Sequence, residues 1–434
     1  MRTFRWPSWR HPIDVLFLLS CVFLTVYVLV PEIWMGGKAK DYGLWYWAGQ
    51  QVLKGGPLYE PVNGIVDFIY PPTSAILLAI PSYFGKVPLY LALSILNSAA
   101  WWATGQLSNA MTGSEKIPGP WLAALPGFAT IAFVFENFAL GQPNLVLLAM
   151  MLAGFWWLFR GGSWLAGSLF ALATAIKVFP VAVFPYLIFR GHWRAAMSMM
   201  IALVLILAVL PAPVRGYQRN ISELTTWFGD MVGSASETGF GQRNAQNWSR
   251  INQSLIAQVH RFSRHINYNQ VDPDFPVGYV NVIDVSFGTA NWIVLGVAGL
   301  IGLGYMAIVP VRPRMTPRST ADELGILFCL MTIASPLARQ YYFVWLFFPI
   351  AVMCHRAAFD PRPQVQRGTW AALALAIVLM LLAVPGFPIV FQALGNYLVA
   401  TAVIIAGLAW HMRNPPEFEK SVSQTSAAPK PGPA

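Results

Sequence analysis

The stretch IDVLFLLSCVFLTVYVLV (residues 13–30) is an almost unbroken apolar run of 18 residues. As a helix it would be about 27 Å long, close to the thickness of the hydrocarbon core of a bilayer. The run follows the basic segment RTFRWPSWRH (residues 2–11) and ends in PEIWMGG without a small-x-small cleavage site, and it exceeds an ordinary signal-peptide core. We therefore expect a retained first membrane span with a cytoplasmic N-terminus.

The composition supports a membrane protein with several spans. The 434 residues are 56% hydrophobic, 14% aromatic and only 11% charged, which a soluble globular chain does not reach. The net charge of +10 comes from short Arg and Lys clusters between apolar runs, as the positive-inside rule predicts, so it does not indicate a nucleic-acid partner. Cys21, Cys329 and Cys354 all lie inside apolar runs and are interpreted as small buried hydrophobic residues.

Apolar runs of 17 to 25 residues predict helices that cross the bilayer. The stretch 164–189 is too long for one span and is broken by KVFP (177–180), so it predicts two short helices with Lys177 at the turn. With that pair, the sequence predicts an all-α polytopic protein of about twelve membrane helices. The other candidate spans are 13–30, 88–108, 120–136, 143–159, 193–212, 288–309, 322–337, 341–357, 368–386 and 391–411.

The basic segments assign the loops to sides. Alternation from a cytoplasmic N-terminus places 311–319, 355–367 and the chain after His411 in the cytoplasm, as their Arg content predicts. Residues 1–412 are thus predicted to form one membrane domain, and 413–434 a disordered cytoplasmic tail. The opposite side receives the segments 31–87, 137–142, 213–287 and 338–340.

The first large loop contains DYGLWYWAGQQVLKGGPLY (41–59), which predicts an amphipathic helix. Leu44, Trp47, Ala48, Gln51 and Val52 fall near helical spacing, and a Gly-Gly-Pro sequence ends the pattern. We expect this helix on the membrane surface, with its Trp and Tyr rings at headgroup depth. Asp41 stands at the helix start, where a carboxylate is a good N-cap. The segment 73–84 is too short for a span and predicts a second interfacial element.

Polar residues gather where the non-cytoplasmic ends of the helices should meet, and such groups at membrane depth are costly unless paired or functional. Each has a plain structural alternative: Asp41 as a cap, Lys177 as a snorkelling cation, the amides as links between helices, Arg339 as an interface anchor. The convergence of these polar residues at one end of the helices favours a functional site. The members are Asp41, Tyr70, Glu136, Asn137, Gln142, Asn144, Lys177, Asn247, Asn252, Arg339 and Gln340.

Several familiar chemistries have no motif in this sequence. It contains no Walker A loop, no G-x-G-x-x-G after a strand, no H-E-x-x-H and no G-x-S-x-G elbow. The six His residues show no ligand spacing, and the D-x-D pattern at 272–274 alone does not support a metal site. We expect neither a metal ion nor another cofactor.

Taken in order, six blocks of this chain resemble glycosyltransferase family 87, whose members have the GT-C architecture. The blocks are DYGLWYWAGQQVLKGGPLY, FIYPPTSAILLAIP, ENFALGQPNLVLL, AGSLFALATAIKVFPVAVFPYLIFR, QNWSRINQSL and ASPLARQYYFVWLFFP. The best-known members are polyprenyl-phosphate-mannose-dependent α-mannosyltransferases. The resemblance implies a lipid-linked sugar donor, a lipid or glycan acceptor, and a catalytic carboxylate just after the first span, which matches Asp41. Tyr341 and Tyr342 stand where relatives often have two His residues.

We therefore predict an integral-membrane hexosyltransferase, which the resemblance places in a bacterial inner membrane with its site on the periplasmic or external side. Asp41 would be the general base, and Lys177 and Arg339 would offset charge on the leaving phosphate. Polar contacts to sugar or acceptor are assigned to Tyr70, Glu136, Gln142, Asn144, Asn247, Asn252 and Gln340, and the ring of Tyr70 or Trp45 could stack on a sugar face. A transporter or flippase of a lipid-linked sugar is the first alternative, although secondary transporters usually show two related halves with matching helix breaks. A pentosyltransferase on the same fold is the second.

Overall fold

A computed structural model describes residues 11–34, 41–59, 68–229, 235–236, 239–240, 247–272, 274–311, 315–383 and 386–416. Within these ranges the chain is helical apart from one antiparallel pair of two-residue strands, β1 (Ala235–Ser236) and β2 (Gly239–Phe240), so the expected all-α class holds. Most of the predicted tail, residues 417–434, lies outside the described residues. The chain divides into an N-terminal unit, which contains Phe4–Leu107 and Ile131–Asn247, and a C-terminal unit, which contains Ser108–Thr130 and Trp248–Ala434.

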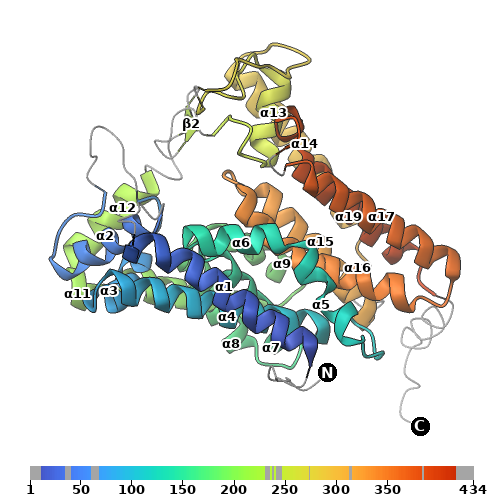
Figure 1. The fold of residues 1–434 in the computed structure, drawn as a ribbon, viewed down its shortest axis with the longest axis horizontal. Coiled ribbons are helices and arrows are strands. Elements are labelled where there is room, and N and C mark those ends of the chain that lie inside the picture. Colours follow the sequence, from blue (N-terminus) through green and yellow to red (C-terminus); the bar gives the residue numbers. More distant parts are fainter. Residues whose placement is uncertain are drawn as a thin grey trace, which may run out of the picture. The chain divides into compact units, whose positions relative to one another are not determined.

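The N-terminal unit begins with the long helix α1, which lies beside α6 (Figure 1). Its helices are α1 (Pro12–Trp34), α2 (Tyr42–Leu53), α3 (Pro72–Tyr83), most of α4 (Lys86–Ala110), α6 (Ile131–Leu140), α7 (Asn144–Leu158), α8 (Ser163–Ile176), the 3₁₀ turn η1 (Phe179–Ala182), α9 (Val183–Phe189), α10 (Trp193–Val204), the π turn η2 (Leu205–Val209), α11 (Ala212–Arg215) and α12 (Tyr217–Phe228).

Small residues let the helices of this unit approach closely, as is typical of membrane proteins. A side chain at Gly167 of α8 would collide with the backbone of Ala195 in α10, and one at Gly49 of α2 would collide with Ser82 of α3. The short helices α2, α3, α11 and α12 lie together at one end of the unit (Figure 1).

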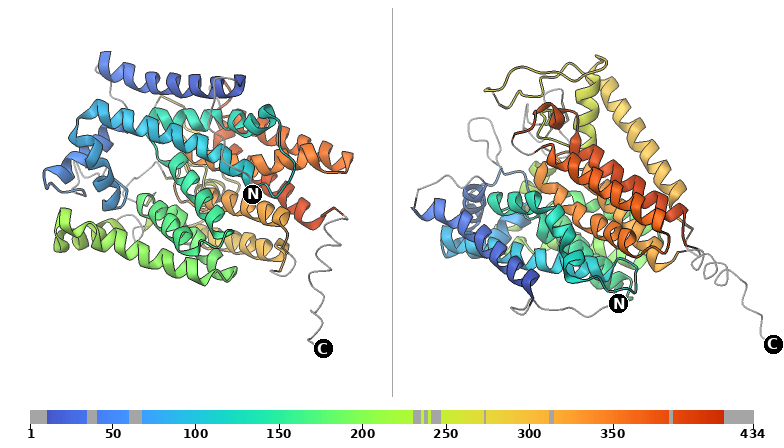
Figure 2. Two further views of the ribbon diagram at one scale, coloured as in Figure 1. Left: turned by 90° about the horizontal axis from the view of Figure 1, so that it is seen from below. Right: turned by 45° about the vertical axis from the view of Figure 1, so that its right-hand side comes forward.

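The C-terminal unit is built around α16, whose side chains are almost all buried. Its helices are α5 (Pro120–Ala129), α13 (Leu255–Ser263), α14 (Phe287–Ile308), α15 (Pro317–Ala334), the 3₁₀ helix η5 (Gln340–Leu346), α16 (Phe347–Phe359), α17 (Pro363–Leu381), α18 (Val390–Ala393) and α19 (Asn396–Arg413). Helices α17 and α19 pack side by side, and both also contact α16 (Figure 2).

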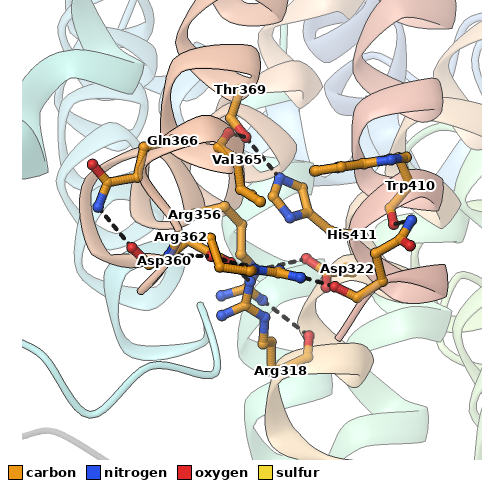
Figure 3. A network of polar contacts seen from close by, with 11 residues as sticks. Arg318, Asp322, Arg356, Asp360, Arg362, Val365, Gln366, Thr369, Trp410 and His411 are labelled. Carbon is orange, nitrogen blue, oxygen red and sulfur yellow. Dashed lines mark hydrogen bonds and ion pairs between the residues drawn. The ribbon is translucent and has the colours of Figure 1, made fainter. Parts of the chain in front are cut away.

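A buried ion network joins four helices of the C-terminal unit (Figure 3). Arg356 of α16 donates to Asp322 of α15 at 3.0 Å, and both side chains are at most 2% exposed. Asp360, which follows α16, accepts from Arg318 at 2.7 Å and from Arg362 at 2.9 Å. Apart from Asp322, which opens the predicted span 322–337, these residues come from the segments 311–319 and 355–367, which the charge pattern places on the same side of the membrane. Arg362 also donates to the backbone of Asn414 at 2.9 Å. The three predicted cytoplasmic segments therefore meet, while the side itself stays a prediction.

The expected count of twelve spans is not confirmed. Within the described residues, five helices are long and apolar enough to cross a membrane, or up to seven if two bent pairs each form one span. The predicted span 120–136 consists of α5 and α6, which are separated at Thr130, and α7 has only 15 residues. The break at Lys177 is confirmed, because α8 ends at Ile176 and a 3₁₀ turn follows.

A helix is present in the first loop, as the sequence predicts. Helix α2 buries Tyr42, Trp45, Ala48, Gly49 and Val52 against the rest of the N-terminal unit, so the face packed against protein is offset from the apolar stripe inferred from the spacing. Aromatic residues occupy both faces of this helix, and spacing alone does not show which ring finds a protein partner. The position of α2 at the membrane surface stays a prediction.

Candidate active site

Asp41 immediately precedes α2, as the sequence predicts, yet its side chain does not cap the helix. The carboxylate turns away from the backbone amides, and its Oδ2 accepts a hydrogen bond from Nε2 of Gln142 at 2.7 Å. Asp41 is half-buried, whereas Gln142 is only 1% exposed. The plain alternative of a helix cap is therefore not what the structure shows.

Gln142 links the acid to two further members of the predicted set. Its Oε1 accepts from the Tyr70 hydroxyl at 3.0 Å and from Nζ of Lys177 at 3.2 Å. The same ammonium lies 5.4 Å from the centre of the Tyr70 ring, within the range of a cation–π contact. Tyr70 and Lys177 are each 6% exposed, so this cation is held in a largely water-free place.

Two asparagines extend the network into the helices. Lys177 Nζ also donates to Oδ1 of Asn144 at 3.2 Å, and Asn144 Nδ2 donates to Oδ1 of Asn137 at 3.1 Å. Asn137 in turn donates to the backbone carbonyl of Phe133 at 2.7 Å. Both asparagines are fully buried, so most of their hydrogen-bonding capacity serves to hold this network in place.

The turn between α6 and α7 places Gln142 against the start of α2. Gly141 has φ of +64°, and a Cβ there would lie 2.9 Å from the Tyr42 ring, so the position requires glycine. The Tyr42 hydroxyl donates to the carbonyl of Phe138 at 2.6 Å, and Trp45 donates to that of Leu140 at 3.1 Å. Burial raises the pKa of Tyr42, which keeps its hydroxyl a neutral donor.

The helix break at Lys177 is equally fixed. The backbone of Lys177 is extended (φ −153°, ψ 123°), which lets its side chain leave the axis of α8. Ser74 of α3 donates to the carbonyl of Ile176 at 3.1 Å and so satisfies one of the open carbonyls at the helix end. This hydrogen bond joins the start of α3, next to Tyr70, to the end of α8, next to Lys177. The edge of Tyr70 meets Trp45, which is 4% exposed, so both rings are largely covered by protein.

The opposite end of α2 is held by a pair of charges that the sequence reasoning missed. Arg215 pairs with Glu223 and donates to the carbonyls of Gly56, at 2.9 Å, and Gln51, at 3.4 Å. The side chain of Arg215 is 1% exposed. In the sequence, Arg219 and Glu223 have the i,i+4 spacing of a helical ion pair, and they do pair at 3.2 Å, whereas Arg215 lies before Gly216, which separates α11 from α12.

Other predicted site residues belong to separate groups. In the C-terminal unit the amide of Asn252 is used by backbone partners, the carbonyl of Pro336 at 2.9 Å and the N–H of Ala338 at 3.0 Å. Arg339 and Gln340 follow at the start of η5 and are half-buried. The two blocks NWSRINQS and ASPLARQYY therefore do meet, and Asn252 has a structural role in holding them. Tyr341 and Tyr342 are buried and stack with ring centres 5.2 Å apart.

The remaining two predicted residues lie in the N-terminal unit. Glu136 is half-buried on α6, and Asn247 is fully buried at the end of the unit. Among the described residues, no group of three or more His, Cys, Asp or Glu side chains could hold a metal ion. Asp272 of the D-x-D pattern instead pairs with Arg250 at 2.7 Å.

Comparison with known families identifies the class. A model of glycosyltransferase family 87 matches residues 68–336, more than half of the chain, so this protein belongs to that family. The matched region contains Tyr70, Gln142, Asn144 and Lys177, while Asp41 precedes it.

Two relatives come from Mycobacterium tuberculosis. The chain is 28% identical over 166 residues to a polyprenol-phosphate-mannose-dependent alpha-(1-2)-phosphatidylinositol mannoside mannosyltransferase of strain H37Rv, which covers 35% of this chain and 38% of that protein. It is 25% identical over 328 residues to a polyprenol-phosphate-mannose-dependent alpha-(1-2)-phosphatidylinositol pentamannoside mannosyltransferase of strain CDC 1551. That match covers 72% of this chain and 64% of the relative. The chain therefore spans less than two thirds of either relative.

Among solved structures, the chain is similar to the crystal structure of ArnT from Cupriavidus metallidurans bound to undecaprenyl phosphate. The identity is 14% and the TM-score 0.36, with 92% of this chain and 77% of that chain covered.

Proposed function

We propose that this protein is an integral-membrane glycosyltransferase that moves a hexose from a polyprenyl-phosphate-linked donor to a lipid or glycan acceptor on the non-cytoplasmic face. The observation that carries the proposal is the Asp41 carboxylate, which is half-buried and accepts from an amide that also binds Lys177. Membership of family 87 supports the reaction class, and the names of both relatives support a polyprenyl-phosphate donor with mannose as the first sugar to test.

In the proposed reaction Asp41 is the general base. As the acceptor oxygen attacks the anomeric carbon, its proton passes to the Asp41 carboxylate and the bond between that carbon and the phosphate oxygen breaks. The electron pair of the broken bond leaves with the polyprenyl phosphate. Attack from the face opposite the phosphate inverts the anomeric centre. A carboxylate in a half-buried site can take part without competing with bulk water for every hydrogen bond.

Cations near the leaving group would stabilise the charge that develops on the phosphate. Lys177 is proposed for this role because its ammonium is fixed by neutral acceptors, the amides of Gln142 and Asn144. Arg339 is proposed as the second cation. Tyr70, Glu136, Asn144, Asn247 and Gln340 stay the proposed contacts for sugar or acceptor. The backbone partners of Asn252 favour a structural part for that residue.

The test is Asp41→Asn in purified full-length protein in nanodiscs. The donor is polyprenyl-phospho-mannose labelled in the sugar, and the acceptors are a phosphatidylinositol mannoside or a total bacterial lipid extract. We expect transfer to fall by at least about a hundredfold, in line with the loss of a general base. Because Asp41 makes no cap hydrogen bond, thermal stability should change little. Asp272→Asn is the matched control, since this external acid pairs with Arg250 and should keep its activity.

The outcomes separate the alternatives. Near-normal transfer by a well-folded Asp41→Asn protein would rule out the general-base role. If the protein in sealed vesicles moves the labelled donor across the bilayer unchanged and no product forms, the transporter alternative is favoured. If a pentosyl donor is used and mannosyl and glucosyl donors are not, the hexose assignment is wrong. We propose no metal, so an excess of EDTA should leave the rate unchanged.

A further inference from the structure

Gln142 has a position in the N-terminal unit that suits neither a sugar ligand nor a packing residue. It is 1% exposed, and both the nitrogen and the oxygen of its amide group are hydrogen-bonded inside the protein. Nε2 donates to Asp41 at 2.7 Å, and Oε1 accepts from Tyr70 at 3.0 Å and from Lys177 at 3.2 Å. A residue whose donors and acceptors are already used in this way has little left for a substrate.

The chemistry of the neighbours fixes the orientation of this amide. An ammonium has three donors and no acceptor, and an ionised carboxylate only accepts. If the amide were turned over, its NH₂ group would face the ammonium of Lys177 and its oxygen would face the carboxylate of Asp41. Both contacts would be repulsive. The observed orientation is therefore the one that suits a carboxylate on one side and an ammonium on the other.

Among the described residues, Gln142 is the only side chain that hydrogen-bonds the Asp41 carboxylate. A donor aimed at the charged form of an acid favours that form over the neutral one. The backbone around Gln142 is fixed as well, by the positive φ of Gly141 and by the hydrogen bonds from Tyr42 and Trp45 to the end of α6. The amide thus has both the chemistry and the rigidity to orient the acid.

We propose that Gln142 is a positioning residue: it keeps Asp41 ionised and aimed, and it connects this base to the cation Lys177. This inference rests on the proposed function and replaces the sequence-based role of Gln142 as a sugar or acceptor contact. It makes the acid and the cation one coupled pair, with the Tyr70 hydroxyl holding the shared oxygen in place.

The experiment compares Gln142→Met and Gln142→Glu with the wild type over a range of pH, using polyprenyl-phospho-mannose as donor. Met keeps the length of the side chain and removes the donor, so the acidic limb of the rate profile should move to higher pH by about one to two units. Glu adds a second carboxylate beside Asp41, and the repulsion between the two opposes the ionisation of Asp41 further. The acidic limb of the Gln142→Glu profile should therefore lie at a still higher pH than that of Gln142→Met. Gln50→Met is the matched control, because it removes a half-buried glutamine contact from α2 to the Ser82 carbonyl of α3 and should leave the limb in place.

A second readout does not depend on transfer. Dicyclohexylcarbodiimide modifies protonated carboxyl groups, so its rate of reaction at Asp41, followed by mass spectrometry, should fall as the pH rises through the ionisation of this acid. The midpoint should move upward in the same order: wild type, Gln142→Met, Gln142→Glu. Folding is checked by thermal stability in the same nanodiscs.

Midpoints and acidic limbs within about 0.3 unit of the wild type in both variants would overturn the inference, even if Asp41→Asn is inactive and the proposed function stands. A raised KM for the donor with an unmoved limb would make Gln142 a substrate contact instead. Conversely, the predicted order of carbodiimide midpoints in a protein without transferase activity would support the positioning role and refute the proposed function.

Discussion

Replacing Arg356 by Met should strongly destabilise the C-terminal unit, and the structure gives the size of the effect. Arg356 is 2% exposed and makes one hydrogen bond to Asp322 and one to the carbonyl of Arg318, each at 3.0 Å. Without the guanidinium, the carboxylate of Asp322 stays buried with its main partner gone. Removing one member of such a buried pair costs about 3–5 kcal/mol. For a unit of this size that lowers the melting temperature by about 10 °C.

The assay is thermal unfolding of purified protein in detergent, followed by loss of the monodisperse peak after heating. Arg413→Met is the control, because this arginine is exposed at the end of α19 and makes one long contact of 3.3 Å to the carbonyl of Ala307. It should shift the melting temperature by no more than about 2 °C. Comparison of the two variants separates the loss of a buried pair from the loss of any arginine.

A double variant tests the reason for the effect. Replacing Asp322 by Leu together with Arg356→Met removes both charges, so no ion is left buried without a partner, and much of the lost stability should return. If the double variant is less stable than Arg356→Met alone, the destabilisation does not come from an unpaired carboxylate. If Arg356→Met and Arg413→Met lose the same stability, the network does not stabilise this end of the unit.

Two further predictions concern other positions. Gly141→Ala should lower thermal stability more than Gly161→Ala, because both glycines have positive φ but only the first would place a Cβ against the Tyr42 ring; equal losses would contradict this. Burial lowers the pKa of His260 to about 4, so folding favours neutral histidine, full stability is present above about pH 6.5, and up to about 3 kcal/mol is lost as the pH falls to 4. His260→Asn should flatten this pH dependence of the melting temperature, and an unchanged slope would show that other groups cause it.

The sequence predicted the meeting of Asp41, Tyr70, Gln142, Asn144 and Lys177, because one physical rule connects them. Polar groups at membrane depth must find each other, and topology placed these five on the same side. The sequence also predicted the helix break at Lys177, because Pro180 follows this cation closely inside an apolar run.

Other features depend on tertiary partners and could not be read from one chain. The buried face of α2 is set by the carbonyls of Phe138 and Leu140, which accept from Tyr42 and Trp45. The role of Gln142 as a link needed the positions of three neighbours. The number of spans could not be settled from apolar runs alone, because such runs do not reveal interruptions such as the one at Thr130, where two short helices follow one another.

The polar clusters around Asp360 and around Asp41 differ in a way that bears on function. Asp360 is fully buried and accepts from Arg318 and Arg362; burial would raise its pKa, but these hydrogen bonds outweigh burial and hold the pKa at about 2. An acid with so little proton affinity and no exposed oxygen is suited to structure, not to proton transfer. Among the described residues, the Asp41 carboxylate accepts from one neutral donor on one oxygen, and the residue is half-buried, so its other oxygen is available in this part of the structure for an incoming hydroxyl group. Since a general base needs both access and an uncommitted lone pair, Asp41 meets requirements that the more tightly bonded acid does not.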